Sequence, residues 1–135
     1  MRVVLDTNVF ISGVFFSSPP NRILRAWRDS LIKLVISAEI LEEYRRIGEM
    51  LSKRFSGIDL EPFLALLAVE AEVVLAPSIR APICEDPDDD IFIYCALAGN
   101  SKCIVSGDKH LKNATGYRGI EIIAPRTFID KYLKK

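Results

Sequence analysis

The chain has 135 residues, half of them hydrophobic, which fits one domain with one sizeable core. Lys and Arg together number 18, as do Asp and Glu. This balance excludes a polybasic protein that coats DNA, but it does not exclude nucleic-acid binding. The acids are unevenly spread, since five of them lie within residues 85–90. We therefore expect a single domain over residues 1–135, with this acidic cluster as its most informative feature.

The start of the chain and the cysteines indicate the compartment. Only three apolar residues stand directly before Asp6, so the apolar core of a signal peptide is missing. No apolar run approaches the roughly 20 residues of a membrane-spanning helix. The three cysteines, Cys84, Cys95 and Cys103, form no CxxC pair, which favours neither a zinc site nor a disulfide framework. We expect reduced, mostly buried thiols and a cytoplasmic protein with no membrane contact.

Short apolar runs alternate with helical patterns along the chain. This alternation predicts an α/β fold with a mainly parallel sheet of about five strands. Functional groups of such sheets gather outside the carboxyl ends of the strands. The runs predict buried strands at 3–5, 34–36, 73–75, 103–105 and 120–123. Helical patterns cover 21–31, 38–54, 60–71, 87–98 and 126–134, and loop signals lie at 17–20 and 76–78.

Polar residues follow the first two predicted strands. Asp6 comes directly after the first strand, although it or Asn8 would also serve simply as the cap of a following helix. Ser37 follows the second strand and is a good N-cap for the helix 38–54. On a helical wheel, Glu43 lies at the edge of the apolar stripe of that helix, which turns it towards the strand ends. The alternative for Glu43 is a surface ion pair.

The acidic cluster stands before a helix that is apolar nearly all round. Asp86 suits its N-cap and Pro87 its first position, but capping explains only one or two of the acids. Like charges this close destabilise one another unless a bound cation or basic side chains join them. Asp108 follows the fourth strand, where the alternative role is to cap a short turn at 109–111. His110, the single histidine, is expected to be a surface or packing residue.

Together these acids are expected to converge on one cleft at the carboxyl edge of the sheet. Carboxylate oxygens are hard ligands that suit Mg²⁺ or Mn²⁺, and the lack of Cys and His in the cleft disfavours zinc. Two such ions about 4 Å apart can activate a water and stabilise the leaving oxygen in phosphodiester cleavage. The residues therefore favour a metal-dependent nuclease.

Four segments, taken in order, resemble the motifs of PIN domains. Residues 5–9 (LDTNV) are similar to the first motif, and residues 37–43, with Ser and Glu six apart, are similar to the second. Residues 86–99, an acidic run leading into an apolar helix, are similar to the third. Residues 105–111 (VSGDKHL) are similar to the fourth. One motif would be weak, but four in order across nearly the whole chain make the resemblance specific.

The resemblance implies a three-layer, Rossmann-like α/β/α sandwich and a ribonuclease that depends on Mg²⁺ or Mn²⁺. Small stand-alone PIN chains resemble VapC-like toxins, which implies an RNA substrate, a small antitoxin and a second copy of the chain as partners. The implied catalytic and metal-binding quartet is Asp6, Glu43, Asp89 and Asp108. The expected supporting residues are Thr7, Asn8, Ser37, Asp86, Asp90 and Ser106, and Lys109 and Arg80 are candidates for contacts with RNA phosphates.

Two other classes of function remain open at this point. A phosphatase or receiver-like domain would use Asp6 as a nucleophile, but Asn8 stands where a further acid is usual. A non-catalytic module would keep the fold and bind RNA or a partner without cutting. Trapping of phosphorylated Asp6 would favour the first class, and RNA binding that ignores metal and never leads to cleavage would favour the second.

Overall fold

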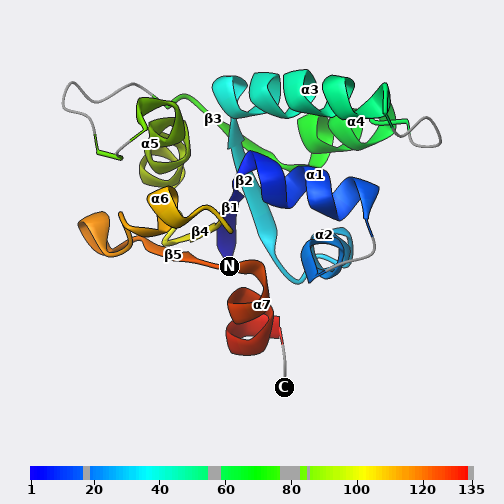
Figure 1. Cartoon of the computed structure of the whole chain (residues 1–135). Helices are drawn as coiled ribbons and strands as arrows, with labels where there is room; N and C mark the ends of the chain where they lie inside the picture. The colour runs from blue at the N-terminus through cyan, green and yellow to red at the C-terminus, as the bar shows by residue number, and fades with distance from the viewer. Residues whose placement is uncertain (17–18, 55–58, 77–82, 85, 134–135) are drawn as a thin grey trace.

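The fold was analysed in a computed structural model, which describes residues 1–16, 19–54, 59–76, 83–84 and 86–133. Five parallel strands form one sheet in the order β3-β2-β1-β4-β5 (Figure 1). The predicted parallel sheet is thus confirmed. At its centre, Val3 lies opposite Leu34 on one side and opposite Cys103 on the other. The strands are β1 (Arg2–Leu5), β2 (Lys33–Ser37), β3 (Glu72–Val74), β4 (Cys103–Val105) and β5 (Glu121–Ile123).

Helices cover both faces of the sheet and complete a three-layer α/β/α sandwich, as expected. One helix, α5, packs across β1, β2 and β4 on one face, and α6 lies on the same side (Figure 1). The other helices pack on the opposite face, where α1 contacts both α2 and α3 and α7 contacts α2. The helices are α1 (Thr7–Phe15), α2 (Pro19–Arg28), α3 (Ala38–Ser52), α4 (Glu61–Glu70), α5 (Asp90–Ala98), α6 (Lys109–Lys112) and α7 (Pro125–Phe128), with short turns η1 (Pro87–Asp89), η2 (Tyr117–Gly119) and η3 (Ile129–Leu133).

The core lies between these layers and explains why the strands are apolar on both faces. Side chains of β1 and β4 such as Val4 and Ile104 are fully buried because helices cover both sides of the sheet. The three cysteines are buried free thiols, as predicted, and burial raises the pKa of each to about 12. No helix formed by the described residues is both long and apolar enough to cross a membrane.

Two segments differ from the sequence-based expectations. Helix α1 was absent from the predicted helices because its β-branched residues and Gly13 have low helix propensity. Packing overrides that propensity, since a Cβ on Gly13 would come within 2.7 Å of the Leu24 side chain. Pro19 and Pro20 were expected in a loop but begin α2. Proline is tolerated there because a backbone N–H in the first turn has no hydrogen-bond partner within the helix. The rest of that loop signal, 17–18, and residues 77–78 of the other lie outside the described residues.

Other helix boundaries shift without a change of fold. The predicted helix 87–98 is divided into η1 and α5. The predicted helix 126–134 becomes α7 and the short π-helix η3, and residue 134 lies outside the described residues. In α4, Leu64 and Leu67 are buried, while Leu66 is exposed. The apolar face of α4 is therefore only partly used by the core.

The central position of β4 yields a stability prediction. Ile104→Ala should lower the free energy of unfolding by about 3 kcal/mol, because a buried cavity replaces the lost side-chain atoms. Val73→Ala is the control, since Val73 is 57% exposed on the edge strand β3, and it should change stability by less than about 0.5 kcal/mol. Chemical denaturation measures both variants, and equal losses would contradict the central burial of β4.

Candidate active site

The sheet order places two carboxylates at the point where the chain changes direction. From β1 the chain passes to β2 and β3, and it then crosses back to β4 on the other side of β1. Such a switch point leaves a crevice outside the carboxyl ends of the two strands. Asp6 directly follows β1 and Asp108 comes shortly after β4. Both therefore lie at the carboxyl edge of the sheet, after neighbouring strands, as the sequence predicted.

Asp6 is nearly buried, with only 4% of its surface exposed. Its Oδ1 accepts a hydrogen bond from the Val9 amide at 2.8 Å, so Asp6 caps α1. Its Oδ2 accepts a hydrogen bond from the Ser106 hydroxyl. Burial raises the pKa of Asp6 to about 6 against the lowering effect of these hydrogen bonds, and the charges of Asp108 and Glu43 add to the rise. The cap and the site carboxylate are thus one residue, and neither role excludes the other.

Helix α3 brings Glu43 to the same place. Ser37 caps the helix by accepting a hydrogen bond from the Ile40 amide at 3.3 Å, as predicted. Tyr44 donates its hydroxyl to the carbonyl of Leu5, which ties α3 to the end of β1. Its ring stacks on Phe10 with centroids 4.3 Å apart. The neighbouring Glu43 is thereby turned towards the start of α1.

The Glu43 carboxylate has two partners in the structure. Thr7, the first residue of α1, donates its hydroxyl to Glu43 Oε2. Arg46 lies about one helical turn further along α3, and its Nη2 is 3.7 Å from Glu43 Oε1. The ion-pair alternative therefore holds in part, since one carboxylate oxygen faces a surface arginine while the other faces the site.

The acidic cluster divides into residues with different environments. Asp86 caps η1 by accepting the Asp88 amide at 3.0 Å, which agrees with its predicted capping role, and Asp88 is exposed. Asp90 is buried, and its oxygens accept the Ile83 and Cys84 amides at 3.1 and 2.7 Å. Asp89 is partly exposed, between the exposed Asp88 and the buried Asp90. Burial raises its pKa to about 6, with further rises from Asp108, Asp86, Asp6 and Glu43.

Ser106 connects the two acids of the switch point. Its hydroxyl donates to Asp6 and accepts the amide of Asp108 at 2.9 Å. Asp108 itself caps α6 by accepting the His110 amide at 2.8 Å, so the capping alternative is also realised. Ser106 is fully buried, which fixes its hydroxyl between the two acids.

The charges of Asp6, Glu43, Asp89 and Asp108 act on one another, and we call these residues the acidic quartet. Among the lysines and arginines that the structure describes, only Arg46 forms an ion pair with a quartet member. No three Asp, Glu, His or Cys side chains within the described ranges already form a cage for a metal ion. In the structure, Asp6 and Glu43 instead accept hydrogen bonds from the hydroxyls of Ser106 and Thr7. An all-oxygen donor set with excess negative charge fits a hard divalent cation.

The remaining candidates are less closely tied to the quartet. Asn8 is exposed in the first turn of α1, and Lys109 is exposed at the start of α6. The Ser37 hydroxyl is used by the cap of α3, and Arg80 lies outside the described residues. Sequence reasoning missed Tyr44 and Arg46 as site neighbours. Tyr44 and Arg46 follow Glu43 by one and three residues on the same helix, and this spacing could have identified them.

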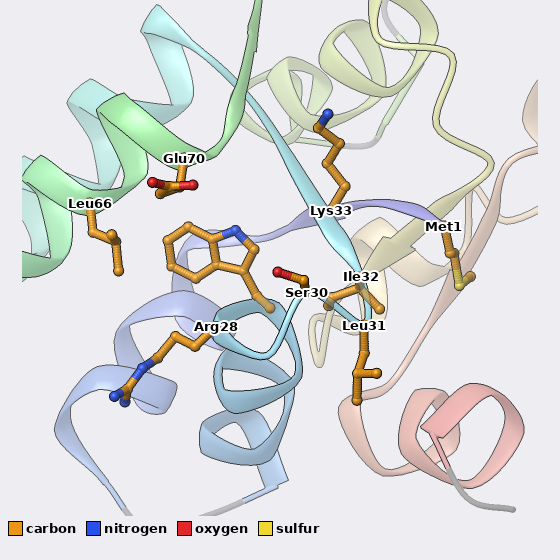
Figure 2. A pocket seen from close by; sticks show the side chains of 9 residues that line it. Met1, Arg28, Ser30, Leu31, Ile32, Lys33, Leu66 and Glu70 are labelled. Atoms are coloured by element: carbon orange, nitrogen blue, oxygen red, sulfur yellow. The ribbon is translucent and has the colours of Figure 1, made fainter.

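A large surface hollow lies elsewhere, at the opposite edge of the sheet (Figure 2). It has a volume of about 670 Å³ and includes Met1 and Lys33, which stand at the amino ends of β1 and β2. Leu31 and Leu66 line it together with Glu70. Its position at the amino ends of β1 and β2 separates it from the acidic quartet, none of whose members lines it.

Comparison with known proteins assigns the family. Residues 2–110 match the PIN domain family, and the chain belongs to this family, whose fold is of the nuclease type. A relative from Methanocaldococcus jannaschii, named "Uncharacterized protein MJ1680", is 30% identical over 146 aligned positions, which cover 99% of this chain and 93% of the relative. The matched range contains every member of the acidic quartet.

The crowded charges yield a prediction about stability and pH. Folding raises the pKa of Asp89 from 3.8 to about 6, so the folded state binds more protons than the unfolded state between these values. Stability due to this group therefore falls as pH rises from about 4 to about 6. In the presence of EDTA, Asp89→Asn should raise the melting temperature at pH 7 and have little effect at pH 4.

The control for this prediction is Asp88→Asn, because Asp88 is an exposed neighbour in the same turn. Thermal melts of the two variants and the wild type across this pH range give the comparison. An Asp89→Asn protein that is less stable than the wild type at pH 7 would contradict charge crowding in the acidic quartet.

Proposed function

We propose that this protein is a ribonuclease that hydrolyses phosphodiester bonds with the help of Mg²⁺ or Mn²⁺. The observation that carries the proposal is the acidic quartet at the switch point of a PIN domain fold. Four mutually repelling carboxylates are unfavourable unless a cation joins them. Groups with perturbed pKa values that gather in one crevice are candidates for a functional site.

The quartet Asp6, Glu43, Asp89 and Asp108 would hold the cation. Bound Mg²⁺ or Mn²⁺ supplies a lowered pKa for water and neutralises charge that develops on the phosphate. The protein supplies the placement of the carboxylates. Ser106 holds one oxygen of Asp6, and Thr7 holds one oxygen of Glu43.

Other residues of the site act on the quartet in this proposal. Asp86 adds negative charge next to Asp89, and Asp90 holds the backbone before α5 in place through two amides. Asn8 and Lys109 are exposed near Asp6 and Asp108, where an amide and a cation suit contact with a phosphate.

The finer proposal is that the whole chain forms one PIN domain that serves as the toxin of a toxin–antitoxin pair. Strand β5 lies beyond the family match yet completes the sheet, which supports a single domain. Exposed apolar side chains such as Leu31 and Val69 support protein partners, namely a small antitoxin and a second copy of the chain. The buried free thiols suit the reducing cytoplasm.

The proposed function is tested by cleavage of a mixed panel of single-stranded and structured RNA with Mn²⁺, Mg²⁺ or EDTA. Wild type should cut only with metal, and Asp6→Asn should lower the rate about a hundredfold or more, because a lost ligand removes several kcal/mol of charge stabilisation. Asp88→Asn is the matched control and should cut normally, because its exposed carboxylate lies outside the quartet. Cutting by Asp6→Asn at the wild-type rate would refute the proposed site.

A second prediction concerns Ser106, which orients Asp6 and Asp108 without belonging to the quartet. Ser106→Ala should lower the affinity for Mn²⁺ about 10- to 100-fold, as is usual when a residue that orients a ligand is lost. Isothermal titration with Mn²⁺ measures the change, and Ser106→Thr should restore part of it because it keeps a hydroxyl. Unchanged Mn²⁺ affinity in Ser106→Ala would show that the bridge does not organise the site.

A further inference from the structure

Helix α3 carries two neighbouring arginines that pair with different carboxylates. Arg46 follows Glu43 by three residues, so the two side chains lie on one side of the helix. Arg46 Nη2 is 3.7 Å from Glu43 Oε1, within the range of an ion pair. Arg45 points to another side, where its Nη1 is 2.8 Å from Glu61 Oε1 on α4. Arg46 is therefore the arginine of α3 that stands beside the acidic quartet.

The contact between Arg46 and Glu43 is loose. Its length of 3.7 Å is too great for a hydrogen bond, and 61% of the Arg46 side chain is exposed. Among the ion pairs of the described residues, Glu43 is the one partner of Arg46. A guanidinium carries several N–H donors in a planar fork, so Arg46 keeps donors for a further anion.

A divalent cation and Arg46 would compete for the same carboxylate. Both oxygens of Glu43 are engaged in this structure, one by Arg46 and the other by the Thr7 hydroxyl. A cation held by the quartet would weaken the attraction between Glu43 and Arg46, because it shares the negative charge of Glu43 and repels the guanidinium. Cation binding would thereby release Arg46 from Glu43 while its backbone stays in place on α3.

An RNA phosphate meets different conditions with and without the cation. Without it, the four carboxylates repel the phosphate, and Glu43 engages Arg46. With a cation bound, this repulsion is smaller and the guanidinium of Arg46 is available. Arginine suits such a contact because its planar fork matches two oxygens of one phosphate.

We propose that Arg46 exchanges Glu43 for a backbone phosphate of the RNA when the acidic quartet binds a divalent cation. This inference rests on the proposed ribonuclease function and adds to it a residue that contacts the substrate in the metal-bound state. Loss of the Arg46 charge then acts in opposite directions on two kinds of binding. Cation binding becomes tighter because a competitor for Glu43 is removed, and RNA binding becomes weaker because a phosphate contact is lost.

The first measurement is the affinity for Mn²⁺ in the absence of RNA, by isothermal titration. Arg46→Gln should bind Mn²⁺ about two- to fivefold more tightly than the wild type, which is the scale of a partly exposed ion pair. Arg45→Gln is the matched control, since it removes the same charge from the next residue, whose partner is Glu61. Unchanged or weaker Mn²⁺ binding by Arg46→Gln, or an equal gain in Arg45→Gln, would overturn the competition for Glu43.

The second measurement is RNA binding at low salt, by fluorescence anisotropy with a short labelled RNA. Ca²⁺, which also binds oxygen ligands, serves as the cation, and a denaturing gel verifies that the RNA stays intact. In Ca²⁺, Arg46→Gln should raise the Kd about threefold or more, and Arg45→Gln should change it less than about 1.5-fold. In EDTA, the effect of Arg46→Gln should be smaller than in Ca²⁺, because Glu43 engages the wild-type arginine.

Arg46→Lys separates the charge from the planar fork. Lysine keeps the charge that pairs with Glu43, so its Mn²⁺ affinity should match that of the wild type. It lacks the fork that binds two phosphate oxygens, so its RNA affinity in Ca²⁺ should lie between those of the wild type and Arg46→Gln. Wild-type RNA affinity of Arg46→Gln in Ca²⁺, or an equal loss in EDTA and Ca²⁺, would overturn the exchange of partners.

The ribonuclease proposal is judged separately, by Mn²⁺ binding and metal-dependent cleavage with Arg46 intact. If both occur and Arg46→Gln matches the wild type in each titration, the exchange is wrong and the ribonuclease proposal stands. If the opposite shifts in Mn²⁺ and RNA affinity occur without any cleavage, Arg46 contacts RNA as proposed and the ribonuclease proposal fails. A wild type that binds no RNA in Ca²⁺ would overturn the inference.

Discussion

The site depends on one energetic conflict, the burial of the Asp6 carboxylate at the end of the central strand β1. Burial disfavours the charged form and raises its pKa to about 6. The hydrogen bonds from Val9 and Ser106 offset this cost only in part. Three further carboxylates, those of Glu43, Asp89 and Asp108, lie close enough for their charges to repel one another and Asp6. In the proposed ribonuclease, a bound divalent cation relieves this repulsion.

Positioning of the site residues follows from contacts between segments far apart in the sequence. The Ser106 hydroxyl is hydrogen-bonded both to Asp6, which follows β1, and to the Asp108 amide after β4. It therefore links the carboxyl ends of these two neighbouring strands. The Tyr44 hydroxyl donates a hydrogen bond to the Leu5 carbonyl, which holds α3 at the end of β1 and so positions the neighbouring Glu43.

The sequence predicted the strands well because each is a short apolar run covered on both faces. The sequence also predicted the positions of Asp6 and Asp108 at the carboxyl edge of the sheet, because the end of a strand fixes where the next residues lie. It did not predict that Asp90 turns to the amides of Ile83 and Cys84, because neighbouring acids in one run look alike until the path of the backbone is known. Helix α1 was foreseen only as an alternative, a helix capped by Asp6 or Asn8, because its residues have low helix propensity and it is stabilised by packing against α2 and α3.

The most direct test of a cation site is a crystal of the protein soaked in Mn²⁺ and measured for anomalous scattering from manganese. The account predicts a manganese peak in direct contact with an oxygen of Asp6 and with oxygens of at least two of Glu43, Asp89 and Asp108. It also predicts that Asp6 or Glu43 turns from its hydroxyl donor towards the ion. Manganese bound elsewhere, with the acidic quartet unchanged and without an ion, would contradict the account.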